Sequence, residues 1–101
     1  MAVGSGEKVN VQNVNHPGQV KAVDAEKYRA MKGAYLEALP KTEPGLTLDE
    51  IRARLISSLP AILFPGGVGA GWWAKTVQLD LEAKGIVVRD RSSPIRLRKV
   101  R

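Results

Sequence analysis

The sequence predicts a small α+β domain in which three helices are followed by a C-terminal β-hairpin. Apolar residues recur at helical spacing before Pro40, Pro60 and Gly85, and after Gly85 they alternate with charged residues as in strands. The 101 residues, 44% of them hydrophobic and 26% charged, are enough for one core. We expect a flexible lead-in over residues 1–7 and a single domain over residues 8–101.

The start of the domain has a weaker strand pattern. Val9 and Val11 alternate with polar residues, and residues 15–18 (NHPG) have the composition of a turn. This predicts a short N-terminal hairpin with His16 in its turn. A lone histidine without a partner motif is a poor candidate for catalysis.

The first helix is predicted to begin after Asp24 and to end before Pro40. The Asp24 carboxylate can accept hydrogen bonds from the free amides of the first turn. A buried stripe at helical spacing is expected to pack into the core. Its members are Tyr28, Met31, Tyr35 and Leu39.

The second helix is predicted by a capping box formed by Thr47 and Glu50, and it should end at Pro60. Its expected buried face consists of Leu48, Ile51, Leu55 and Leu59. Residues 61–65 (AILFP) are apolar and too short to assign, so a strand and a helical turn both remain open.

The third helix is predicted over residues 71–84, with Gly85 as the left-handed residue that ends it. One apolar face combines Trp73, Ala74, Val77 and Leu81. We expect Trp73 to be buried and Trp72 to be only partly covered. The remaining outward strip contains Lys75, Gln78 and Glu82.

The C-terminal hairpin is predicted from the two runs IVVRDR and IRLRKVR, with a tip near Ser92, Ser93 and Pro94. Alternation in the second run should turn Ile95 and Leu97 toward the core. It should leave Arg96 and Arg98 exposed.

The composition excludes several kinds of site. The chain has no cysteine and one histidine, so disulfides, thiolate zinc sites and multi-histidine metal sites are excluded. We find no acid–base constellation and therefore do not expect an enzyme, a metal or a cofactor. No apolar run approaches the roughly 20 residues of a membrane span, so we expect a cytoplasmic protein without membrane contact.

A glycine motif before the third helix invites a nucleotide-binding interpretation, since Gly69, Gly71 and Ala74 satisfy G-x-G-x-x-A. Residues 65–68 (PGGV) separate this motif from the apolar run, however, and two tryptophans place bulk where a pyrophosphate would approach. Only eleven residues follow Asp90, too few for further parallel strands. We therefore expect no bound nucleotide cofactor.

The positive charge is concentrated near the C-terminus. The net charge is +6, and residues 75–101 contribute eight basic against three acidic side chains, a net of +5. Such a field attracts polyanions, whereas a solubilising tail is the alternative interpretation.

The end of the third predicted helix resembles a known family. The run Leu81, Glu82, Lys84, Gly85, Ile86, Val87 and Arg89 is similar to the L-E-x-K-G-hydrophobic-hydrophobic-x-R pattern of winged-helix transcription factors. That pattern closes the recognition helix and opens the wing, the hairpin that lies along the DNA backbone. The resemblance implies a winged helix-turn-helix fold with three helices and a C-terminal β-hairpin wing. The connection over residues 59–70 is longer than the three or four residues of a regular helix-turn-helix.

A second resemblance covers most of the chain from residue 10 onward. The segments NVNHPG, FPGG and GWWAKTVQLDLEAKG resemble those of a small bacterial family of uncharacterised proteins. This resemblance implies no activity.

Binding of duplex DNA is the first function that these features indicate. Lys75 and Gln78 can pair with base edges, and the wing arginines can neutralise phosphates. The residues expected to contact DNA are Trp72, Lys75, Thr76, Gln78, Arg89, Arg91, Arg96 and Arg98. The alternative is a protein-interaction module with the same fold, in which a partly exposed tryptophan anchors a protein partner.

Overall fold

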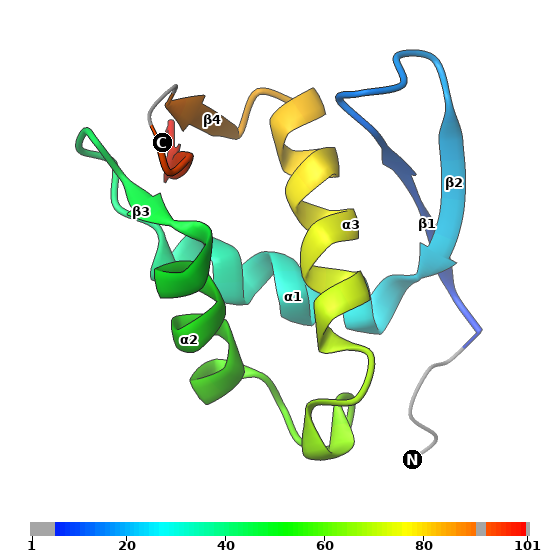
Figure 1. The fold of residues 1–101 in the computed structure, drawn as a ribbon. Helices are drawn as coiled ribbons and strands as arrows, with labels where there is room; N and C mark the ends of the chain where they lie inside the picture. The colour runs from blue at the N-terminus through cyan, green and yellow to red at the C-terminus, as the bar shows by residue number, and fades with distance from the viewer. Residues whose placement is uncertain (1–5, 91–92, 101) are drawn as a thin grey trace.

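The structure is a computed structural model that describes residues 6–90 and 93–100 (Figure 1). Three α-helices and two antiparallel sheets make up the described part of the chain, so the predicted α+β class is confirmed. The elements in order are β1 (Lys8–Gln12), β2 (Val20–Asp24), α1 (Ala25–Ala38), β3 (Leu46–Thr47), α2 (Leu48–Ser58), the 3₁₀ turn η1 (Pro65–Gly67), α3 (Ala70–Ala83), β4 (Val87–Asp90) and β5 (Arg96–Lys99).

The predicted N-terminal hairpin is present. β1 and β2 pair antiparallel from Lys8 opposite Asp24 to Gln12 opposite Val20, and His16 lies in the exposed turn. Of the predicted lead-in, residues 1–5 lie outside the described residues. Glu7 is held in place, because its carbonyl accepts a 3.0 Å hydrogen bond from the Ala25 amide.

Both predicted helix caps are present. The Asp24 carboxylate accepts a 2.9 Å hydrogen bond from the Lys27 amide at the start of α1. At the start of α2, the Thr47 hydroxyl accepts from the Glu50 amide and the Glu50 carboxylate accepts from the Thr47 amide. These local hydrogen bonds satisfy amides that have no partner within the helix, which is why each helix begins there.

The predicted buried face of α1 is confirmed, and that of α2 is partly wrong. Tyr28, Met31, Tyr35 and Leu39 are all buried. In α2, Ile51 and Leu55 are buried, whereas Leu48 is 40% exposed and Leu59 only partly covered. Leu48 is the first residue of α2 and lines two pockets instead of packing into the core.

The C-terminal hairpin is part of a larger sheet than predicted. β3 pairs with β5, so the strand order is β3-β5-β4 and the central strand is β5. Gly45 permits this close approach, because it has a φ of +82° and a Cβ there would overlap the Leu97 carbonyl. Leu97 is fully buried as predicted, but Ile95 is 38% exposed and does not face the core. Ile95 precedes β5, so the alternation of inward and outward side chains along that strand does not apply to it.

Residues 61–65 do not form a strand. The amides of Leu63 and Phe64 both donate to the Pro60 carbonyl, which closes a helical turn, and η1 follows. Phe64 is the buried anchor of this long connection, with 3% of its surface exposed. β4 pairs antiparallel with β5, so residues 61–90 are not the strand, helix and parallel strand of a dinucleotide-binding fold.

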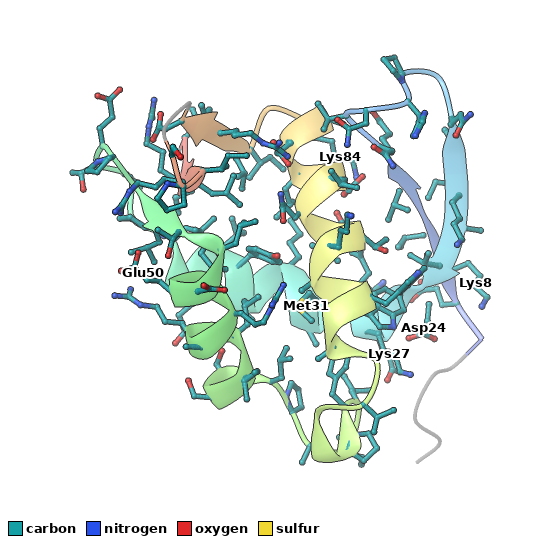
Figure 2. The ribbon with its side chains drawn as sticks, viewed as in Figure 1. Lys8, Asp24, Lys27, Met31, Glu50 and Lys84 are labelled. Atoms are coloured by element: carbon teal, nitrogen blue, oxygen red, sulfur yellow. The ribbon has the colours of Figure 1, made fainter. Side chains whose placement is uncertain are left out.

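The core lies where the three helices meet the β3-β5-β4 sheet. Met31, Ile51, Val77, Leu81 and Leu97 are its most deeply buried apolar side chains. Met31 belongs to α1 and lies between α2 and α3 in the view of Figure 2. α1 packs against both other helices and so leaves one side of α3 facing outward.

Candidate nucleic-acid interface

The outward side of α3 is open over its first two turns. Trp72 is 48% exposed, Lys75 is exposed and Thr76 is half-buried. Val77 and Leu81 lie on the opposite side of the helix and are fully buried. Trp73 is half-buried rather than buried as predicted, and its ring meets the ring of Trp72 edge to face at 5.1 Å.

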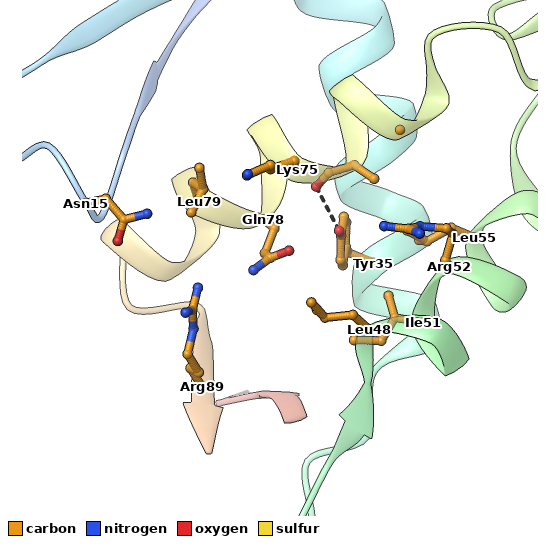
Figure 3. Close-up of a pocket in the computed structure, with 12 residues that line it drawn as sticks. Asn15, Tyr35, Leu48, Ile51, Arg52, Leu55, Lys75, Gln78, Leu79 and Arg89 are labelled. Atoms are coloured by element: carbon orange, nitrogen blue, oxygen red, sulfur yellow. Dashed lines mark hydrogen bonds between the residues drawn. The ribbon is translucent and has the colours of Figure 1, made fainter. Parts of the chain in front are cut away.

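A pocket of about 340 Å³, here called the basic pocket, lies between α2 and α3 (Figure 3). Its polar lining includes Arg52 from α2, Lys75 and Gln78 from α3, and Arg89 from β4. Tyr35 lies at its base and donates a 2.7 Å hydrogen bond to the Ala74 carbonyl. Burial raises the pKa of the Tyr35 hydroxyl, so this group stays a neutral donor near physiological pH.

A second pocket of about 220 Å³, the hairpin pocket, lies between α3 and the β1–β2 hairpin. Three amide side chains line it, from Gln12, Asn13 and Gln19. Lys21 completes the pocket, with its ammonium group 4.8 Å from the centre of the Trp72 ring. This cation–π contact holds a positive charge beside the exposed ring.

The two pockets share one electrostatic character. Together they are lined by four cationic and five amide side chains and by no carboxylate. Arg52 and Lys75 make no hydrogen bond or ion pair within residues 6–90 and 93–100. The cations are Lys21, Arg52, Lys75 and Arg89. Lys21, Arg52 and Lys75 therefore offer positive charge to a ligand on this face, whereas Arg89 and Gln78 are bonded to Glu82.

The second half of α3 is covered by the β1–β2 turn. The Val14 amide donates a 3.3 Å hydrogen bond to the Leu79 carbonyl, and Leu79 is 9% exposed. Gln78 was expected to face outward, but it is 9% exposed and its amide donates to the Glu82 carboxylate at 3.1 Å. The expectation failed because helical spacing contains no information about a turn more than sixty residues away in the chain.

Arg96 and Arg98 are only partly exposed, which corrects the prediction for these two residues, and all three described wing arginines are paired. Arg89 forms a two-pronged pair with Glu82 at 3.0 and 3.1 Å. The Arg98 side chain is 23% exposed and pairs with Asp90 at 3.2 Å. Arg96 lies 3.6 Å from Glu50 and donates to the Gly45 carbonyl at 3.2 Å. The carboxylates come from neighbouring elements that the alternation did not reveal, and Arg91 lies outside the described residues.

Asp80 is a buried residue that sequence reasoning missed. Its fully buried carboxylate accepts hydrogen bonds from the Tyr28 hydroxyl, the Gln12 backbone N–H at 2.8 Å and the Lys84 ammonium at 2.9 Å. Lys84 lies at the end of α3 in Figure 2. Asp80 follows Val77 by three residues, so the helical projection could have placed it on the buried face. Its contacts join α3 to α1 and β1.

The described residues contain no cluster of three histidine, aspartate or glutamate side chains that could hold a metal ion. Within the same residues, each helix is too short or too polar to span a bilayer.

Comparison with known proteins places the chain in a family. A family model described as a family of unknown function, DUF6958, matches residues 8–97. The chain belongs to this family. The DUF6958 match covers every described helix and both sheets almost to the end of β5. No curated protein and no solved structure matches the chain.

Proposed function

We propose that this chain is a duplex DNA-binding domain of the winged-helix type, which uses the open turns of α3 and the pockets on either side of them. One observation carries the proposal: the pockets around these turns are lined by no carboxylate, and three of their four cations, Lys21, Arg52 and Lys75, have no ion pair among the described residues. Cations neutralise phosphates, and amides bond to base edges, so this combination suits a nucleic acid better than it suits another polyanion.

The order of elements supports the winged-helix part of the proposal. Three helices precede the β4–β5 hairpin, which pairs with β3 to form a small sheet beside them (Figure 1). In winged-helix proteins the third helix enters the major groove, and here the first two turns of α3 have an exposed side. Lys75 lies in the middle of that side.

The proposal gives distinct roles to the residues around α3. Lys75 is placed to reach base acceptors such as those of guanine, and Thr76 to contact base edges or a thymine methyl. Lys21 and Arg52 lie on opposite sides of α3 and would contact phosphates on the two strands. Arg96 and Arg98 have a smaller role in this proposal, because their charges are already partnered.

Binding of a labelled random duplex over a range of salt concentrations tests the proposal. Because each phosphate contact releases a counterion, the logarithm of the affinity should fall linearly with the logarithm of the salt concentration. The double variant Lys21→Gln/Arg52→Gln removes two such contacts and should reduce the slope by about 2. The matched control is Lys41→Gln, an exposed lysine that lines neither pocket.

Two outcomes would contradict the proposal. One is the absence of duplex binding at low salt. The other is an equal loss of slope per charge in Lys41→Gln and in the double variant, since that result would indicate attraction by net charge alone.

A protein-interaction role is the second candidate, and exposed apolar side chains favour it. Ile56 is 61% exposed, Ile62 72% and Val68 76%, and all three lie at or near the connection between α2 and α3. Exposed apolar residues can belong to interaction surfaces. A chain that binds no DNA at low salt, yet loses association with a partner protein on Ile62→Ser/Val68→Ser substitution, would support this role.

A further inference from the structure

A groove separates α2 from α3, and the basic pocket is only one part of it. The other part, here called the apolar pocket, has a volume of about 400 Å³. The two pockets share Arg52, Leu55, Gly71 and Ala74 as lining residues, so they lie next to each other. Residues 59–69 form the long connection that spaces the two helices, and Phe64 from this connection lines the apolar pocket.

The two parts of the groove differ sharply in chemistry. The apolar pocket is lined by Met31, Leu55, Ile56, Leu59 and Phe64, together with small residues. Arg52 is its one charged lining residue, and it stands where the apolar pocket meets the basic pocket. Beyond that junction the basic pocket adds Lys75 and Arg89.

We infer that this α2–α3 groove binds a small organic acid with an apolar tail. The anionic head, a carboxylate or a phosphate, lies between Arg52 and Lys75, and the tail lies along the apolar pocket. Both cations lack an ion pair within the part of the chain that the structure describes, so the head supplies the missing countercharge. Each pocket has a volume typical of part of a small-molecule site.

Gly71 provides a steric test of the groove. It lies in α3 at the junction of the two pockets, and a Cβ added there meets no atom within 4 Å. A larger side chain at this position therefore fills the groove without displacing the core. Gly33 is the matched control, because it is an exposed helical glycine in α1 whose added Cβ also meets nothing within 4 Å.

The experiment is calorimetric titration of the full chain, without DNA, using decanoate, decyl phosphate, decanol and acetate below micelle-forming concentrations. Decanoate or decyl phosphate should bind, and the tighter of the two identifies the head group. Decanol lacks the charge and acetate lacks the tail, so each should bind at least about tenfold more weakly. Arg52→Gln and Lys75→Gln should each weaken binding of the acid by about tenfold.

Gly71→Leu should abolish binding of the acid, whereas Gly33→Leu should bind it as the wild type does. Thermal melting of each variant shows whether it is folded. If Gly71→Leu does not fold, Gly71→Ala takes its place in the titration and should bind the acid more weakly than the wild type. Equal binding of decanol and decanoate, or unchanged binding in both Gly71 variants, would overturn the inference. The inference does not rest on the proposed DNA interface, since the titration contains no DNA.

Discussion

Asp80 is the residue whose surroundings matter most for the integrity of α3. It carries a charge in the interior, and such a charge is tolerated only when its hydrogen bonds are satisfied. Tyr28, Gln12 and Lys84 satisfy them from three different elements. The Lys84 ammonium also lies 5.4 Å from the centre of the Tyr28 ring, so the same cation contacts both Asp80 and Tyr28. Burial and the hydrogen bond to Asp80 raise the pKa of Tyr28, which keeps its hydroxyl protonated as a donor.

Replacing Asp80 with asparagine should destabilise the protein strongly. The substitution turns one acceptor into a donor that faces other donors, and it leaves Lys84 without its countercharge. We expect the free energy of unfolding to fall by about 3–5 kcal/mol, measured by urea denaturation. Asp49→Asn is the control, because Asp49 is exposed at the start of α2. A loss no larger than that of the control would show that the buried charge has no structural role.

At the scale of elements, α2 depends on hydrogen bonds at its first turn. Hydrogen bonds from the Thr47 backbone and hydroxyl lower the pKa of Glu50. A lowered pKa means that the folded state favours the charged carboxylate. The contribution is therefore fully present above the ordinary glutamate pKa and is lost as the pH falls through the lowered value.

The substitution Thr47→Val should shift the pKa of Glu50 upward, but only part of the way to its ordinary value. Valine removes the hydroxyl, whereas the backbone amide at position 47 still donates to the carboxylate. An NMR pH titration of Glu50 in both proteins measures the shift. The loss of the N-cap hydroxyl should also cost about 1 kcal/mol of stability. An unchanged Glu50 pKa would mean that the hydroxyl does not act on this carboxylate.

Local signals predicted the elements well, whereas contacts distant in sequence went undetected. Asp24 and Thr47 cap helices through neighbours three residues away, so the sequence around them was sufficient. β3 has two residues and pairs with a strand about fifty positions later, and no periodic pattern can reveal such pairing. The same reason explains Gln78 and the wing arginines, whose exposure was decided by elements elsewhere in the chain.

At the scale of the whole molecule, ion pairs connect the strands of the β3-β5-β4 sheet to one another. Arg98 lies on the central strand and reaches Asp90 on β4 at 3.2 Å and Glu43, just before β3, at 3.5 Å. It thereby connects both edges of the sheet. Its main effect should be on stability rather than on binding of a polyanion.

Arg98→Met should lower the free energy of unfolding by about 1–2 kcal/mol, because Asp90 would lose its partner in a partly covered position. The slope of DNA affinity against salt should remain near that of the wild type. Chemical denaturation and the duplex titration measure the two effects on the same protein. A loss of slope by about one unit without destabilisation would instead place Arg98 on a phosphate.

The β1–β2 turn limits how much of α3 any duplex can touch. Its contact at Leu79 leaves residues 70–76 as the partly exposed stretch of the helix, and at 1.5 Å per residue this stretch extends about 10 Å along the helix axis. Since base pairs are stacked about 3.4 Å apart, one copy of the domain could inspect about three of them. A sequence of three base pairs occurs very many times in any genome. Recognition of a unique DNA site by this fold would therefore require several copies bound next to one another, or a partner protein that recognises the flanking sequence.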